Sequence, residues 1–176
     1  MARLPYVEQD PSNPPDVAAT YSEITAIGRK IVNYQKMLAN QPAALRALMT
    51  MARYVRNQTE LPDDLREFAI LGTAAALGVE YEYVHHLEFA RDHVGISEEK
   101  LRALPEWRAA TVFSKNELAV LEYADQVART RRVDDQTFAA LREFLSPAQI
   151  VDLTLVLAWY HLGAAFLLPL QVELEH

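Results

Sequence analysis

The chain has 176 residues and a formal net charge of -7, with 51% hydrophobic and 23% charged residues, which is the composition of one ordinary globular domain. No run of Lys and Arg forms a basic stripe, so we expect no nucleic-acid partner. Cysteine is absent. This excludes disulfides, thiolate metal ligands and thiol nucleophiles from the chain, and it is compatible with a cytoplasmic location.

The N-terminal segment is rich in proline, with four of the nine prolines in the first fifteen residues. We therefore expect an extended arm over residues 1–15 and a single helical domain over residues 16–173. The last residues, 174–176, resemble the start of an expression tag, so His176 is left out of any site.

The sequence of the first part of the domain predicts three helices. One begins near Asp16 and carries apolar side chains at helical spacing as far as Tyr34. Pro42 opens the second, because proline is favoured in the first turn of a helix. The third follows Pro62 and ends at Gly78. It has so few polar residues that we expect it to be central.

Capping signals place the next three helices. A fourth covers about 80–93 and ends at Gly95, and a short fifth begins at Ser97. Ser114 starts the sixth, with Glu117 three positions later, which is the pattern of a capping box.

Asp134 or Asp135 caps a seventh helix, and the last helix runs from about 148 to 168. This last helix is apolar nearly all round, although His161 and Pro169 interrupt it, and we expect it to be a core helix that does not span a membrane. Other helices or a second copy of the chain must cover it, which favours a homo-oligomer. No strand pattern remains, so the sequence predicts an all-α fold of about seven to eight helices.

One segment concentrates ionisable residues, because two adjacent histidines, three glutamates and two tyrosines share the fourth helix. Glu82 lies one helical turn before both His85 and His86, and His86 borders the apolar stripe. A histidine beside a carboxylate can act as an acid or base near neutral pH. Glu67, on the apolar third helix, must be exposed, paired or kept neutral.

Each of these residues also has a structural interpretation. His86 and His161 could be core histidines bonded to backbone carbonyls, and Glu67 could be ion-paired with Arg66. Glu82 with His85 has the spacing of half a di-iron site, but no second such pair exists. A single metal ion held by Glu82, His86 and Glu67 is another alternative. We expect no metal and no cofactor.

Several segments together resemble the core motif of the carboxymuconolactone decarboxylase and alkyl hydroperoxidase D superfamily. They are Arg-Glu-Phe-Ala-Ile-Leu at 66–71, Gly-Val-Glu-Tyr-Glu at 78–82, His-His at 85–86, Ala-Arg at 90–91 and Gly-Ile-Ser at 95–97. The resemblance extends over most of the chain. It implies an alkyl hydroperoxidase D-like helical bundle that assembles as a dimer, trimer or hexamer.

The peroxidase branch of this superfamily carries a glutamate, a Cys-x-x-Cys pair and a histidine. When the chain is aligned on His86, the glutamate corresponds to Glu67, and Val79 and Glu82 stand at the two cysteine positions. Peroxide reduction needs those thiols, so it is excluded here. One departure from the family pattern is that the stretch 86–95 is one residue longer than usual.

The resemblance implies a cofactor-independent carbon–carbon lyase or isomerase acting on a small organic acid or lactone. His86 would be the acid or base, Glu67 would orient it, and Glu82 would be the third catalytic residue, beside them. The expected substrate contacts are His85, Tyr83, His161 and Asn33. Two alternatives remain, a non-catalytic small-molecule-binding oligomer and a peroxidase partner that receives thiols from another protein.

Overall fold

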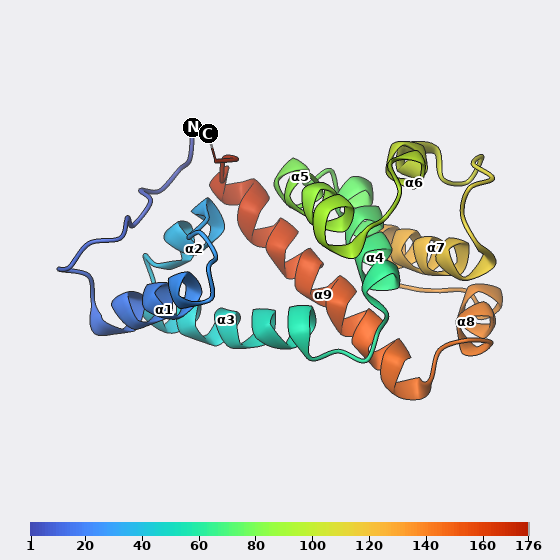
Figure 1. The fold of residues 1–176 in the computed structure, drawn as a ribbon, viewed down its shortest axis with the longest axis horizontal. Coiled ribbons are helices and arrows are strands. Elements are labelled where there is room, and N and C mark those ends of the chain that lie inside the picture. Colours follow the sequence, from blue (N-terminus) through green and yellow to red (C-terminus); the bar gives the residue numbers. More distant parts are fainter. Residues whose placement is uncertain (176) are drawn as a thin grey trace. The chain divides into compact units, whose positions relative to one another are not determined.

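The computed structural model describes residues 1–175, and within that range the regular structure is entirely helical (Figure 1). The α-helices are α1 (Pro15–Ala26), α2 (Asn33–Leu38), α3 (Pro42–Asn57), α4 (Asp63–Leu77), α5 (Glu80–Phe89), α6 (Glu98–Ala103), α7 (Lys115–Thr130), α8 (Asp135–Arg142) and α9 (Pro147–Leu170). A π-helical turn (Ala90–Val94) and a 3-10 turn (Leu104–Glu106) complete them. The prediction of an all-α fold is confirmed. His176 of the suggested tag lies outside the described residues.

The first predicted helix is divided in two. α1 ends at Ala26, and Gly28 then adopts a left-handed backbone with φ of +74°. This conformation favours glycine and ends a helix. The chain resumes as α2 at Asn33, so the helical spacing that reached Tyr34 belonged to two helices.

The chain divides into two compact units, Met1–Gln58 together with the segment from Phe166, and Thr59–Ala165. In the first unit α1 packs against α3. The N-terminal segment is tied down there, because the Tyr21 hydroxyl donates to the Val7 carbonyl at 2.7 Å and the Arg3 amide donates to the Leu170 carbonyl at 3.0 Å.

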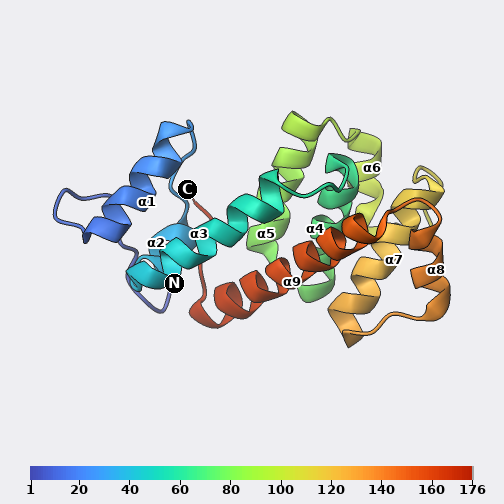
Figure 2. The same ribbon diagram turned by 90° about the horizontal axis from the view of Figure 1, so that it is seen from below.

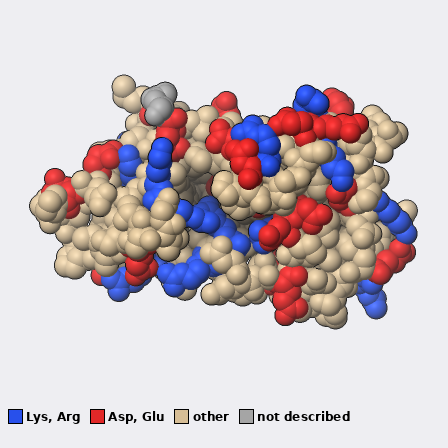
Figure 3. Space-filling view, in the orientation of Figure 1, with Lys and Arg blue, Asp and Glu red and all other residues tan. Residues whose placement is uncertain are grey.

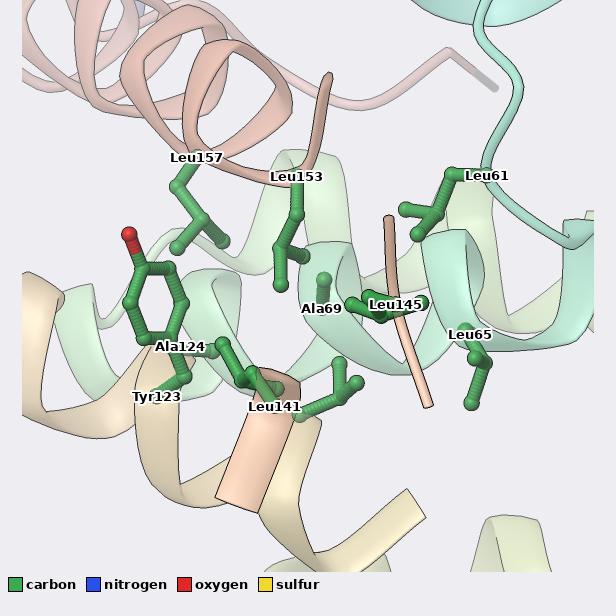
Figure 4. Packing of buried hydrophobic residues seen from close by; sticks show 10 residues of the cluster. Leu61, Leu65, Ala69, Tyr123, Ala124, Leu141, Leu145, Leu153 and Leu157 are labelled. Carbon is green, nitrogen blue, oxygen red and sulfur yellow. The ribbon is translucent and has the colours of Figure 1, made fainter. Parts of the chain in front are cut away.

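In the second unit α4 is central, since it packs against both α5 and α7, and α7 packs against α8 (Figures 1 and 2). Leu153 and Leu157 of α9 point towards Ala69 of α4 and Tyr123 of α7 (Figure 4). Burial of these apolar side chains is the main contribution to stability. Acidic and basic side chains are mixed over α5, α6 and α7 on the face in Figure 3.

Gly78 sets the geometry of the α4–α5 hairpin. It is the C-cap of α4, with a left-handed φ of +67°, and α5 starts two residues later at Glu80. The sharp reversal lays α5 against α4. Residues one helix apart in sequence, such as Glu67 and His86, can therefore meet across the hairpin.

After α5 the helix widens into the π-helical turn Ala90–Val94 and ends at Gly95, whose φ is +80°. A π-helical turn accommodates one additional residue within an otherwise α-helical segment. The turn lies within the stretch 86–95, in which the resemblance implies one residue more than usual.

α9 has 24 residues and contains both His161 and Pro169, so neither residue ends the helix as an interruption would. By length and composition alone α9 is apolar enough to cross a membrane, a test that core helices also pass. In its apolar window 44% is buried, and Leu153, Val156 and Leu157 are fully inaccessible. These three residues place one side of α9 in the core of its unit.

Candidate active site

The predicted pair of Glu67 and His86 is brought into direct contact. Glu67 Oε2 lies 2.7 Å from His86 Nδ1, across the α4–α5 hairpin, and both residues are buried. A carboxylate only accepts hydrogen bonds, so Nδ1 carries the proton and donates to Glu67. This contact fixes the tautomer and orientation of the ring, and the other nitrogen, Nε2, becomes the reactive one.

Nε2 of His86 faces the hydroxyl of Tyr160, a residue of α9 that the sequence analysis missed. The two atoms are 2.7 Å apart, and the rings meet edge to face at 5.0 Å. The sequence predicted the neighbouring His161 as a substrate contact instead. A signal was available, because a tyrosine on the buried stripe of an apolar helix needs a partner for its hydroxyl.

Glu67, His86 and Tyr160 therefore form a continuous hydrogen-bonded chain contributed by α4, α5 and α9. Its parts match the roles in a hydrolase triad, in which an acid orients a histidine and the histidine exchanges a proton with a hydroxyl. When His86 is neutral the phenol donates to Nε2, and when His86 is protonated the phenol accepts. The arrangement can move a proton in either direction.

Glu82, the third predicted catalytic residue, lies beside the same nitrogen. Its Oε2 is 3.9 Å from His86 Nε2, which is too long for a hydrogen bond. Its Oε1 lies over Gly163 of α9, where an added Cβ would approach it to 2.9 Å. The glycine thus leaves the space that the carboxylate occupies.

Arg66 provides a cation behind this cluster. Its Nε lies 3.7 Å from Glu67 Oε1, and its guanidinium also pairs with Asp63 at 2.8 Å. The suggested ion pair between Glu67 and Arg66 is therefore present together with the contact to His86. Arg66 is buried, so its charge helps to offset that of Glu67 in a poorly solvated place.

Two predicted substrate contacts flank this cluster on α5. His85 is half-buried, with Nδ1 2.7 Å from the Tyr81 carbonyl and its ring against that of Tyr81. Tyr83 packs on the apolar cluster that contains Phe68, and burial raises the pKa of its hydroxyl.

The other two predicted contacts, His161 and Asn33, already have hydrogen-bond partners within the described chain. His161 donates from Nδ1 to the Leu157 carbonyl at 2.7 Å, as a core histidine would. Its Nε2 is buried and has no hydrogen-bond partner among residues 1–175. Asn33 lies in the unit formed by Met1–Gln58 and the C-terminal segment, and its amide donates to the Glu173 carbonyl at 3.0 Å.

The described residues contain no cluster of side chains that fits the alternative of a metal site. Among the described residues, no group of three or more His, Asp or Glu side chains is placed to hold a metal ion. Both ring nitrogens of His86 already face protein groups, Glu67 and Tyr160.

About half of the chain matches a known protein family in sequence. Residues 42–126 match the sequence model of the carboxymuconolactone decarboxylase family. This range contains Glu67, Glu82 and His86. An uncharacterised protein of Bacillus subtilis, YdfG, is 25% identical over 118 residues, which cover 66% of this chain and 79% of that protein.

Solved structures share the fold over almost the whole chain. A peroxidase-related protein of Ralstonia eutropha JMP134 with an alkylhydroperoxidase AhpD core aligns over 99% of this chain and 92% of its own, with a TM-score of 0.84 and 20% identity. The debrominase Bmp8, as a cysteine-to-alanine variant in complex with 2,3,4-tribromopyrrole, aligns over 99% of this chain and 94% of its own, with a TM-score of 0.82 and 16% identity. The expected fold is thereby confirmed.

Proposed function

We propose that this chain, a member of the carboxymuconolactone decarboxylase and alkyl hydroperoxidase D-like superfamily that has no cysteine, is an acid–base enzyme of the lyase or isomerase class. Its substrate would be a small organic acid or lactone. The observation that supports this is the unbroken chain of hydrogen bonds from Glu67 through His86 to Tyr160.

In the lyase reaction the substrate loses carbon dioxide, and in the isomerase reaction it gives a proton to the Tyr160 phenolate that forms when the hydroxyl proton moves to His86 Nε2. In both reactions the electron pair of the broken bond is left on an enol-type anion. Tyr160 donates its hydroxyl proton to that anion, and protonated His86 returns a proton from Nε2 to the phenolate. Glu67 keeps the imidazole oriented and stabilises its protonated form. Positioned proton transfer of this kind contributes about 10²–10⁴-fold to a rate.

Thiol peroxidase chemistry lies outside this proposal. Without cysteine the chain has neither the nucleophile nor the resolving thiol that peroxide reduction needs. Transfer of thiols from a partner protein would require a cysteine on that partner, and a peroxide-consumption assay with the purified chain tests this alternative.

We also propose that the protein is cytoplasmic and works as a homo-oligomer. Support comes from α9, on which Val151, Leu162 and Leu168 expose much of their apolar side chains. A second copy would cover such a surface. A monomeric mass in light scattering at micromolar concentration would contradict the oligomer.

The deciding experiment measures carbon dioxide release from 4-carboxymuconolactone by the wild type, His86→Ala and Tyr160→Phe. We expect release by the wild type and a large loss in both variants. Undiminished release by both variants would show that the site lies elsewhere.

The second candidate is a non-catalytic small-molecule-binding protein. It is favoured by the fact that both ring nitrogens of His86 are already within hydrogen-bond distance of protein groups. This candidate predicts saturable binding with no turnover of any organic acid or lactone tested, and hydrogen–deuterium exchange of substrate C–H groups, followed by NMR, separates it from the enzyme.

A further inference from the structure

Arg66 has two acidic neighbours on α4 and makes a close contact with only one of them. Its Nη1 forms an ion pair with Asp63 Oδ1 at 2.8 Å, whereas its Nε lies 3.7 Å from Glu67 Oε1, beyond the usual hydrogen-bond distance. The Arg66 side chain is only 7% exposed, so water solvates its guanidinium poorly. This buried cation therefore depends on two carboxylates, and the closer of them is Asp63.

Glu67 directs its charge to the other side, towards His86. Glu67 Oε2 accepts the Nδ1 proton of His86 at 2.7 Å, and this hydrogen bond orients the ring. A guanidinium carries five donors in a planar fork that fits a carboxylate, and it keeps its positive charge at any pH of interest. A direct bond from Arg66 would therefore compete with His86 for the Glu67 carboxylate.

Asp63 is placed where it prevents this competition. It lies three residues before Arg66, which is the spacing at which side chains meet along one face of a helix. Its side chain is 69% exposed, so its own charge remains solvated while it binds the guanidinium. With Nη1 bound to Asp63, the Nε of Arg66 stays out of hydrogen-bond distance of Glu67.

From these contacts we infer that Asp63 is a positioning residue of the site. It keeps Arg66 away from Glu67, and the Glu67 carboxylate therefore remains bonded to His86. That bond in turn keeps Nε2 of His86 directed at Tyr160. Asp63 acts on the ring only through Arg66. The inference deepens the proposed function and rests on it for the identity of the reacting residues.

Two substitutions on α4 should have opposite effects on the bond between Glu67 and His86. In Asp63→Ala the guanidinium of Arg66 loses its close partner and turns to Glu67, so the bond to His86 weakens. In Arg66→Met the competing cation is absent, and the bond keeps its strength. The double variant should behave like Arg66→Met, because the effect of Asp63 requires Arg66.

The experiment follows the Nδ1 proton of His86 by proton NMR on the intact chain at pH 7. The resonance is identified by its loss in His86→Gln, and its rate of exchange with water reports how often the bond to Glu67 opens. Asp64→Ala is the matched control, because Asp64 is exposed, carries the same charge and lies in the same first turn of α4. Among residues 1–175 it forms no ion pair with Arg66.

We expect exchange at least about tenfold faster in Asp63→Ala than in the wild type, a factor that partial loss of one charged hydrogen bond would produce. Asp64→Ala, Arg66→Met and the double variant should stay close to the wild-type rate. Equal rates in the two aspartate variants would overturn the inference, and so would fast exchange that persists in the double variant. If Arg66→Met does not fold, the comparison of the two aspartate variants decides alone.

Failure of the proposed function would give a different result. If the exchange rates follow the expected pattern but no lactone or organic acid is turned over, the positioning role of Asp63 stands and the enzyme proposal falls. If turnover requires His86 and the two aspartate variants exchange alike, only the positioning role falls. For a true substrate, Asp63→Ala should lower kcat and leave KM nearly unchanged, because it disturbs the orientation of a reacting group.

Discussion

The hydroxyl of Tyr160 lies 2.7 Å from Nε2 of His86, although 74 residues separate the two in the chain. This contact joins α9 to the α4–α5 hairpin at the atom where acid–base chemistry would take place. It also makes Tyr160 the residue through which a proton would reach the substrate.

Replacement of Tyr160 by Phe removes this hydroxyl and keeps the ring. We expect turnover of the true substrate to fall by about 10²-fold or more, because the proton donor is lost. The free energy of unfolding should fall by only about 1 kcal/mol, the usual value of one hydrogen bond. Steady-state kinetics and urea denaturation measure the two effects.

Tyr123→Phe is the matched control for that experiment. Tyr123 is also buried, in the core cluster of α7 and α9, and its hydroxyl bonds to the exposed Thr154 at 2.8 Å. It should lose a similar amount of stability and keep its turnover. Equal loss of turnover in both variants would mean that Tyr160 acts only through packing.

Gly163→Ala tests how closely Glu82 packs against α9. Alanine favours a helix by about 1 kcal/mol over glycine, but its Cβ would displace the end of the flexible Glu82 side chain. We expect the thermal midpoint to change little, because these two effects oppose each other. In a Glu82→Ala background the same change should raise stability, since no carboxylate remains to be moved, and a fall in that background would disprove the account of Gly163.

Gly78→Ala tests the hairpin that brings Glu67 to His86. The residue has a φ of +67°, and a Cβ there would meet nothing within 4 Å. The substitution should therefore lower the free energy of unfolding only through the backbone conformation, by about 1–2 kcal/mol for a left-handed residue. Chemical denaturation measures it, and an unchanged midpoint would show that the turn relaxes into another conformation.

Acidic pH should lower the stability of the fold, because the Glu117 carboxylate becomes protonated. Burial raises the pKa of this carboxyl, but hydrogen bonds from Lys100 at 2.6 Å and from Ser114 outweigh that effect and leave the pKa lowered. A lowered folded-state pKa stabilises the protein above the pKa of the unfolded chain, and the stabilisation is lost as the pH falls through the lowered value. Glu117→Gln should therefore be less stable at pH 7 and show a shallower loss of stability below about pH 4. Parallel pH curves for the two proteins would contradict this.

Much of the fold was predictable because its signals are local. Ser114 and Glu117 form the expected reciprocal capping box, Asp134 caps α8 through the Thr137 amide, and Gly78 ends α4. The apolar periodicity of α4 also indicated its central place. The break at Gly28 was missed because hydrophobic spacing continued across it, and a single glycine signals a helix end only weakly.

For the candidate site, the sequence predicted that Glu67, Glu82 and His86 lie near one another, but it did not select Tyr160 over His161. Both lie on α9, about 100° apart around the helix, and an almost uniformly apolar helix gives no periodicity from which to orient its faces. Only the packing of α9 on the α4–α5 hairpin decides which of the two side chains faces His86. Residue spacing within one helix predicted which side chains share a face. The sequence did not predict which faces of distant helices pack together.

The π-helical turn at Ala90–Val94 has a consequence for chain length. Since the wider turn takes up one extra residue locally, the segments before and after it keep the phase that a shorter helix would give them. An insertion or deletion at this turn can therefore be tolerated without rotating His86 away from Glu67. Relatives that differ by one residue here should be aligned with their gap in the turn, and a chain shortened by removal of Asp92 should fold with an ordinary α-helical turn in its place.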